Sequence, residues 1–165
     1  MTRTLGSQSI RLDVDCSPVP DDEADMDMGG EGEEEEPTEE EEEPEAPPEG
    51  YRVLVTVSDP KLAKVMQVGA FVTDHMRIHR VTMYAAGEEP SADAVFGGMG
   101  EPAAYSGPAF DELDNALQNA FYEYMADRGI DDALATKLSD FCSNKEQLEY
   151  VKWLETMKAF AQGSK

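Results

Sequence analysis

Residues 51–72 read YRVLVTVSDPKLAKVMQVGAFV. Apolar and polar positions alternate with a period of two in the first half, where the apolar side chains are Tyr51, Val53, Val55 and Val57. This period places alternate side chains on opposite faces of a strand. The turn formers Ser58-Asp59-Pro60 follow, and Val65–Val72 is then rich in β-branched and apolar residues. We expect two strands joined by a turn, the second of them covered on both faces.

Strands are also predicted on both sides of this stretch. Upstream, the apolar residues Ile10, Leu12, Val14 and Cys16 alternate with Arg11, Asp13 and Asp15, and Pro18 and Pro20 end the pattern. Downstream, Met76–Tyr84 predicts a strand whose apolar positions change phase between Ile78 and Val81, as a β-bulge would produce. Short turns join these strands, which indicates an antiparallel sheet, whereas Glu88–Ala104 is expected to be a long loop.

After Tyr105 the apolar period becomes helical. A first helix is predicted from a stripe at spacings of three and four, comprising Phe110, Leu113, Leu117, Ala120, Phe121 and Tyr124. Arg128-Gly129 is expected to end it, with a cation near the negative helix end and a glycine at the left-handed position. A second, shorter helix is predicted from Asp131 or Asp132, with the stripe Leu134, Leu138 and Phe141.

A third helix is predicted to start at Ser143, because Ser143 and Glu146 have the spacing of a capping box. Its apolar positions form two overlapping sides, Leu148, Val151 and Leu154 on one and Tyr150, Trp153, Met157 and Phe160 on the other. So wide a stripe predicts a helix buried on more than one flank, against the sheet and against another subunit. Strands first and helices last make the fold class α+β.

The charge of the chain is concentrated in one segment. Of 165 residues, 36 are acidic and 13 basic, a net charge of −23, and 17 of the acids lie in residues 21–50, which hold no Lys or Arg. We expect one domain over residues 1–165 with a disordered acidic insertion at about 21–50, because this stretch has little to bury and repels itself.

Two interpretations of this acidic insertion stay open on composition alone. It can keep the protein in solution, or it can attract basic partners as a polyanion. The candidate residues for binding basic partners are its glutamates, namely Glu33, Glu34, Glu35, Glu36, Glu39, Glu40, Glu41, Glu42 and Glu43.

Several functional classes are disfavoured. A field of this sign repels phosphate, so direct DNA binding is not expected, and no apolar run is long enough to span a membrane. His75 and His79 are too far apart on a strand to share a metal ion, and Gly97-Gly98-Met99-Gly100 lacks the GK[ST] of a phosphate loop. Cys16 and Cys142 lie in unlike contexts and are interpreted as packed or idle thiols. We therefore expect a protein without enzymatic activity, cofactor or metal.

The C-terminal half resembles the mitochondrial glycoprotein family, which comprises mitochondrial acidic matrix proteins and the complement-q-subcomponent-binding protein of animals. The residues that carry the resemblance are Tyr105-Ser106-Gly107-Pro108, Phe110-Asp111-Glu112-Leu113-Asp114, Leu117-Gln118, Phe121, Tyr124, Arg128-Gly129-Ile130, Leu134, Leu138, Lys145-Glu146, Tyr150, Trp153-Leu154 and Phe160. A weaker resemblance extends upstream, where Gly6–Val14 looks like the first strand of the family.

The resemblance implies a strongly twisted antiparallel sheet with C-terminal helices packed on it, and three subunits in a ring with an acidic face. It implies a homotrimer without enzymatic activity that acts as a binding or chaperone-like protein in the mitochondrial matrix. Its expected partners are basic proteins, such as ribosomal or RNA-binding proteins, in mitochondrial translation, ribosome biogenesis and oxidative phosphorylation. Subunit packing is expected at Tyr150, Trp153, Met157 and Phe160.

Members of the family carry a transit peptide and an N-terminal amphipathic helix before the first strand. This sequence begins almost at that strand, so we expect the helix to be absent here and Trp153, Met157 and Phe160 to be left partly uncovered. A shortened gene model would account for this difference. The alternative function is a nuclear or cytosolic acidic protein that resembles a histone chaperone.

Overall fold

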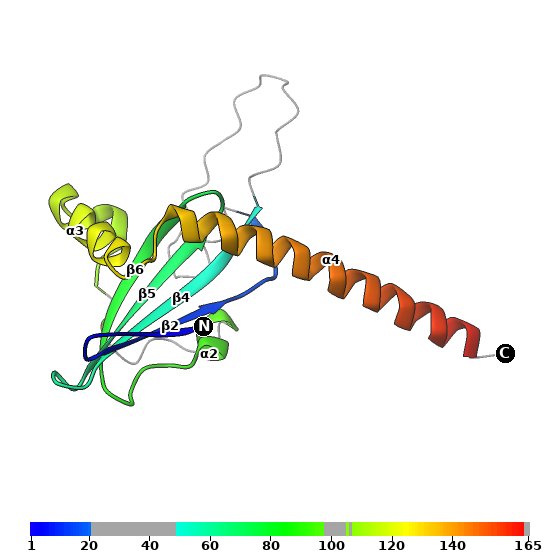
Figure 1. Cartoon of the computed structure of the whole chain (residues 1–165), viewed down its shortest axis with the longest axis horizontal. Coiled ribbons are helices and arrows are strands. Elements are labelled where there is room, and N and C mark those ends of the chain that lie inside the picture. The colour runs from blue at the N-terminus through cyan, green and yellow to red at the C-terminus, as the bar shows by residue number, and fades with distance from the viewer. Residues whose placement is uncertain (21–48, 98–104, 106, 164–165) are drawn as a thin grey trace, which may run out of the picture.

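A computed structural model describes residues 1–20, 49–97, 105 and 107–163. An antiparallel sheet in the order β1-β2-β4-β5-β6 forms the body (Figure 1). Its strands are β1 (Thr2–Leu5), β2 (Gln8–Val14), β4 (Glu49–Asp59), β5 (Lys64–Val72) and β6 (Met76–Ala85), and the short β3 (Val19–Pro20) pairs with the start of β4. The predicted antiparallel α+β architecture is confirmed.

The N-terminal strand pair differs from the prediction. The predicted strand begins at Gln8 instead of Ile10 and ends at Val14, so that Cys16 lies beyond it. Strand β1 was not predicted, and it joins β2 through a two-residue turn at Gly6, whose φ of 59° favours glycine. The polar residues of β1 give no alternating signal, because all of its side chains are exposed.

The predicted bulge lies in β6. Gly69 of β5 pairs with Arg80 and the next residue, Ala70, pairs with Ile78, so His79 is the extra residue. The bulge brings Ile78 and Val81 to the same face, where Ile78 is buried and Val81 packs against the same core. The change of phase in the sequence is therefore the signature of this bulge.

The first predicted helix is confirmed with a later start. Phe110–Glu112 form a short 3₁₀ turn, η1, and α3 (Asn115–Ala126) begins after Asp114, whose carboxylate accepts a hydrogen bond from the Ala116 amide at 2.8 Å. Gly129 has the predicted left-handed conformation with φ of 75°. The amide of Ile130 donates to the Met125 carbonyl at 3.0 Å, which completes a Schellman end.

The second and third predicted helices are one helix, α4 (Asp132–Gly163), so the predicted break at Ser143 is wrong. Neither Gly nor Pro occurs between residues 132 and 162, so nothing in the backbone interrupts the helix. Ser143 and Glu146 have the residue types of a capping box, but both residue types are also tolerated inside a helix. At 1.5 Å per residue, the 32 residues span about 48 Å.

The core lies between one face of the sheet and the helices α3 and α4. Val53, Val55, Val68 and Val72 line this face, and residues of the helical segment cover it, namely Phe110, Met125, Ile130, Ala135 and Leu138. Phe110 makes edge contacts with Phe121 and Tyr122 at ring-centroid distances of 5.9 and 5.6 Å. These contacts hold η1 and α3 together against β6.

The opposite face is covered by the segment around α2 (Ala92–Phe96), which lies within the predicted loop. Arg52 stacks over the Phe96 ring at 5.8 Å from its centroid. Buried Gln67 donates from Nε2 to the Pro90 carbonyl at 2.9 Å. The prediction that β5 is covered on both faces is therefore confirmed.

Replacing Leu138 by alanine tests the packing of α4 on the sheet. Leu138 is 2% exposed, so we expect the free energy of unfolding to fall by about 2–4 kcal/mol in a urea titration. Leu62→Ala is the control, because Leu62 is 68% exposed and its truncation should change stability by less than about 0.5 kcal/mol. Equal losses in the two variants would contradict this packing.

Candidate binding surfaces

Helix α4 is fixed to the body by its N-terminal part only. Ala135, Leu138 and Cys142 are its buried residues. Two polar contacts orient its first turns, since Asp132 accepts from the Met76 amide at 3.2 Å and Thr136 donates to the Asp74 carbonyl at 3.3 Å. Cys142 is the last buried position of the helix.

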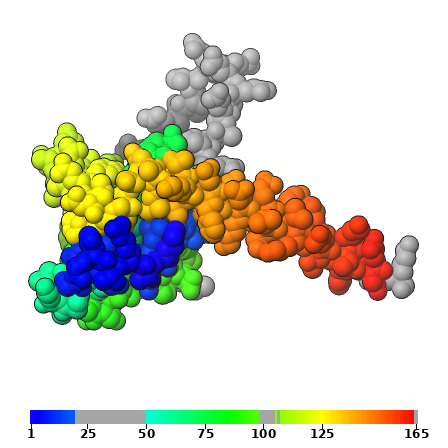
Figure 2. All heavy atoms as spheres, in the orientation of Figure 1, coloured from blue at the N-terminus to red at the C-terminus, as the bar shows by residue number. Residues whose placement is uncertain are grey.

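Beyond Cys142, α4 projects from the body with its side chains in solvent (Figures 1 and 2). Its large apolar residues are at least 43% exposed, comprising Leu148, Tyr150, Val151, Trp153, Leu154, Met157 and Phe160. The expectation that the sheet buries one flank of this helix is wrong, because the strands do not extend below this part of it. The expectation that Trp153, Met157 and Phe160 are uncovered agrees with their exposure.

Four of these residues make a regular seam. Tyr150, Trp153, Met157 and Phe160 are spaced three, four and three apart, the spacing of core positions in a coiled coil. The rings of Tyr150 and Trp153 are stacked, with centroids 6.1 Å apart. The seam lies beside charged residues, where Lys152 and Glu149 form an exposed ion pair at 2.9 Å. An exposed apolar seam of this kind is typical of a surface that another helix covers.

The predicted sites for basic partners, Glu33–Glu36 and Glu39–Glu43, lie outside the described residues. The two ends of the acidic segment are described, however. Pro20 pairs with Glu49 and Val19 with Gly50 in the β3–β4 ladder, so the chain leaves and re-enters the sheet at neighbouring positions. Gly50 has no room for a side chain, because a Cβ atom there would lie 2.7 Å from the Val72 carbonyl oxygen.

An ion pair lies next to the β3–β4 ladder, where the acidic segment leaves the sheet. Arg52 donates from its guanidinium to the Asp15 carboxylate at 2.8 Å, and both side chains are partly buried. Burial alone would raise the pKa of Asp15, but hydrogen bonds from the Ser17 amide and Arg52 outweigh it and lower that pKa below its ordinary value of 3.8. The carboxylate is therefore charged at neutral pH.

The contact between Cys16 and Cys142 was missed by sequence reasoning. Their Sγ atoms are 3.0 Å apart although the residues are separated by 126 positions. The interpretation as packed thiols agrees with this contact, but nothing in the sequence indicated that the two thiols pack against each other. Only the packing of α4 across the end of β2 brings them together, and no local pattern in the sequence signals it.

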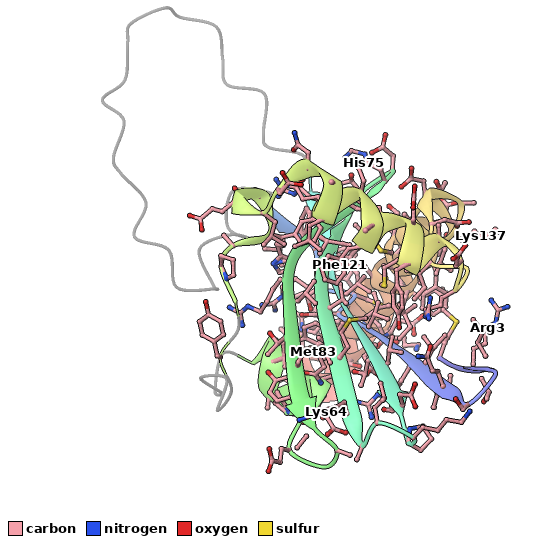
Figure 3. The ribbon with its side chains drawn as sticks, turned by 90° about the vertical axis from the view of Figure 1, so that its left-hand side faces the viewer. Arg3, Lys64, His75, Met83, Phe121 and Lys137 are labelled. Atoms are coloured by element: carbon pink, nitrogen blue, oxygen red, sulfur yellow. The ribbon has the colours of Figure 1, made fainter. Side chains whose placement is uncertain are left out.

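Of the two histidines, only His79 lies on the predicted strand. His75 lies in the turn before β6, at the rim of the molecule, with Nδ1 2.5 Å from the Asp74 carboxylate (Figure 3). His79 lies at the bulge of β6. Among the described residues, no three His, Cys, Asp or Glu side chains are grouped as a metal site. Gly97 ends α2, and residues 98–100 of the glycine-rich motif lie outside the described part.

A small apolar groove lies between α3 and the ends of β4, β5 and β6. It has a volume of about 250 Å³, and its lining includes Met66, Met83, Leu117, Phe121 and Tyr124. Figure 3 shows Lys64 at the lower end of the sheet, Met83 above it and Phe121 below the α3 helix. No helix in the described ranges is long and apolar enough to cross a membrane.

Solved structures with the same fold come from two parasites. A hypothetical protein of Leishmania major, described as a sequence homologue of the human p32 protein, superimposes with a TM-score of 0.66 at 18% identity and covers 97% of this chain and 74% of its own. The p22 protein of Trypanosoma brucei superimposes with a TM-score of 0.65 at 23% identity, and the match covers 96% of this chain and 73% of that protein. The fold is therefore that of p32-like proteins.

The sequence defines the family more closely. Residues 1–161 match the mitochondrial glycoprotein family, and the chain belongs to this family. It is 43% identical over 56 residues to the mitochondrial acidic protein mam33 of Schizosaccharomyces pombe, a match that covers 34% of this chain and 21% of that protein. It is 38% identical over 50 residues to the human mitochondrial complement component 1 Q subcomponent-binding protein, a match that covers 30% of this chain and 18% of that protein. The matched stretches thus span about a fifth of the length of these curated relatives.

The Asp15–Arg52 pair gives a pH dependence that can be measured. Because the pKa of Asp15 is lowered in the folded state, its stabilisation is fully present above pH 3.8 and is lost as the pH falls through the folded pKa. We expect Asp15→Asn to lower the free energy of unfolding by about 1 kcal/mol at pH 7, and the difference from wild type to shrink toward pH 3.

The control is Asp13→Asn, which breaks the more exposed pair with Arg11 and should cost less at pH 7. Urea titrations at both pH values measure all three proteins. A cost of Asp15→Asn that is the same at pH 3 as at pH 7 would contradict the assignment.

Proposed function

We propose that this protein is an acidic binding protein of the mitochondrial matrix, without enzymatic activity, which binds basic proteins through its acidic segment. The observation that carries the proposal is the concentration of charge, with 17 carboxylates and no cation in residues 21–50. Membership of the mitochondrial glycoprotein family supports the localisation, since its relatives are named as mitochondrial and as acidic or binding proteins.

The attachment of the acidic segment also supports this role. Its two ends, Pro20 and Glu49, pair in the β3–β4 ladder, so the acidic segment is attached to the body at one place. With both ends held in the sheet, the 17 carboxylates of residues 21–50 can bind a cationic surface without disturbing the fold. A polyanion of this kind raises the rate of encounter with basic proteins and exchanges readily between them.

The exposed seam of α4 supports assembly into a ring-shaped homotrimer. Three copies would bury Tyr150, Trp153, Met157 and Phe160 between subunits and bring three acidic segments into one particle. Three acidic segments in one trimer would bind an extended basic partner more strongly than one segment, because several weak contacts form at once. Ribosomal and RNA-binding proteins have this chemistry, which connects the protein to mitochondrial translation, ribosome biogenesis and, through the products of translation, oxidative phosphorylation.

A charge-neutralised variant tests the binding function. Replacing all nine glutamates of Glu33–Glu36 and Glu39–Glu43 by glutamine removes nine negative charges and keeps the length of the segment. We expect affinity for a lysine-rich peptide of about 20 residues to fall by at least about tenfold at low salt, as measured by fluorescence anisotropy. For the wild type, affinity should fall as salt rises, because screening shortens the range of these charges to about 8 Å at physiological ionic strength.

The matched control replaces the same nine glutamates by aspartate, which keeps the charge and should keep the affinity near that of the wild type. Unchanged affinity in the glutamine variant would rule out the polyanion role. Equal loss in both variants would also contradict it, because side-chain shape and not charge would then decide binding.

A further inference from the structure

Cys16 and Cys142 form a contact that the proposed function does not use. Cys16 lies in the connection between β2 and β3, two residues beyond the end of β2, and Cys142 lies on the buried side of α4. Their Sγ atoms are 3.0 Å apart, and both cysteines are in the thiol form. Since a disulfide bond is about 2.05 Å long, the two sulfur atoms need to approach by only about 1 Å.

We propose that Cys16 and Cys142 are an oxidisable thiol pair, which a peroxide converts into a disulfide that fastens α4 to the sheet. The two residues differ in access to the oxidant. Cys142 is fully buried, whereas Cys16 is partly exposed. A solvent-borne peroxide therefore meets Cys16 first, and Cys142 is the thiol that resolves the product.

The surroundings of Cys142 agree with this order of events. Burial is the main cause that raises the pKa of the Cys142 thiol to about 12, and the adjoining Cys16 adds to it, while Lys145 opposes it. Cys142 is therefore protonated at neutral pH and is a poor first nucleophile. Tyr51, 8% exposed at the start of β4, lies close enough to both thiols that their charges would influence its hydroxyl. The pair is thus enclosed by β4 and α4.

The chemistry balances with hydrogen peroxide as the oxidant. The Cys16 thiolate attacks one peroxide oxygen, the O–O bond breaks, and the departing hydroxide takes up a proton to leave as water. Cys16 is then a sulfenic acid. The Cys142 sulfur attacks the Cys16 sulfur, the S–O bond breaks, and the hydroxide leaves with the Cys142 proton as a second water. Two thiols have lost two electrons, and one peroxide has become two waters.

The positions of Cys16 and Cys142 determine what a disulfide bond between them would do. Cys142 is the last buried residue before α4 leaves the body, and Cys16 lies five residues before the acidic segment begins at Asp21. A bond between them would close a loop of about 126 residues, which restricts the unfolded chain strongly. It would also fix the angle at which the exposed part of α4 projects.

Peroxide treatment of the purified 165-residue chain tests the proposal. After oxidation, free thiols are alkylated and the protein is digested without reduction. We expect a cross-linked pair of peptides containing Cys16 and Cys142, and migration of the whole chain at 18.1 kDa on a denaturing, non-reducing gel. The thermal midpoint should rise by about 10 °C on oxidation and return on treatment with a dithiol reductant.

Cys16→Ser is the principal variant, because this residue is partly exposed and its replacement leaves the core of α4 unchanged. It should abolish both the cross-link and the shift in thermal midpoint. Cys142→Ala should do the same, with Cys16 now trapped as a sulfenic acid by dimedone. Cross-links between separate chains, over-oxidation of Cys16 with Cys142 still alkylatable, or a cross-link without any rise in thermal midpoint would each overturn the proposal.

Discussion

The packing of the first turns of α4 on the sheet is the contact on which the rest of the molecule depends. Ala135, Leu138 and Cys142 close the core over β4 and β5, and the strands end near the position of Cys142. The helix has no residue that could stop it there, so it continues into solvent. One long, uninterrupted helix on a short sheet therefore produces both a closed core and an uncovered apolar seam.

The same end of the molecule carries the acidic segment. The β3–β4 ladder holds the two ends of the segment together, and the Asp15–Arg52 ion pair lies next to that ladder. Through Cys16, this region also contacts α4 at its last buried residue. The two features with a proposed role in binding, the acidic segment and the seam, are thus attached near the same end of the sheet. A change in the packing of α4 at Cys142 would therefore also affect Cys16, which lies five residues before the acidic segment begins at Asp21.

Local patterns in the sequence predicted those features that local interactions determine, namely most strands, the bulge and one helix end. Alternation predicted β2, β4 and β6, the β-rich apolar run predicted β5, the change of phase at Ile78 and Val81 predicted the bulge, and Gly129 predicted the end of α3, whereas the short β3 was not predicted. The continuity of α4 was missed, because Ser143 and Glu146 satisfy a capping rule without being at a helix end. The contact of Cys16 with Cys142 could not be predicted either, since it depends on tertiary packing across 126 positions. Binding by Glu33–Glu43 and subunit packing at Trp153 stay predictions.

Native mass spectrometry at moderate salt, at about 10 μM chain, tests most directly whether the seam of α4 is a subunit interface. We predict a 54.3 kDa species, three times the 18.1 kDa mass of one chain, for the wild type. The control variant Leu62→Glu should form the same species, because Leu62 is exposed and lies in the β4–β5 turn. Trp153→Glu should give the 18.1 kDa monomer instead, because a charge in the seam cannot be buried. A wild type that is monomeric at every concentration, or a Trp153→Glu variant that still forms the 54.3 kDa species, would contradict this account of α4.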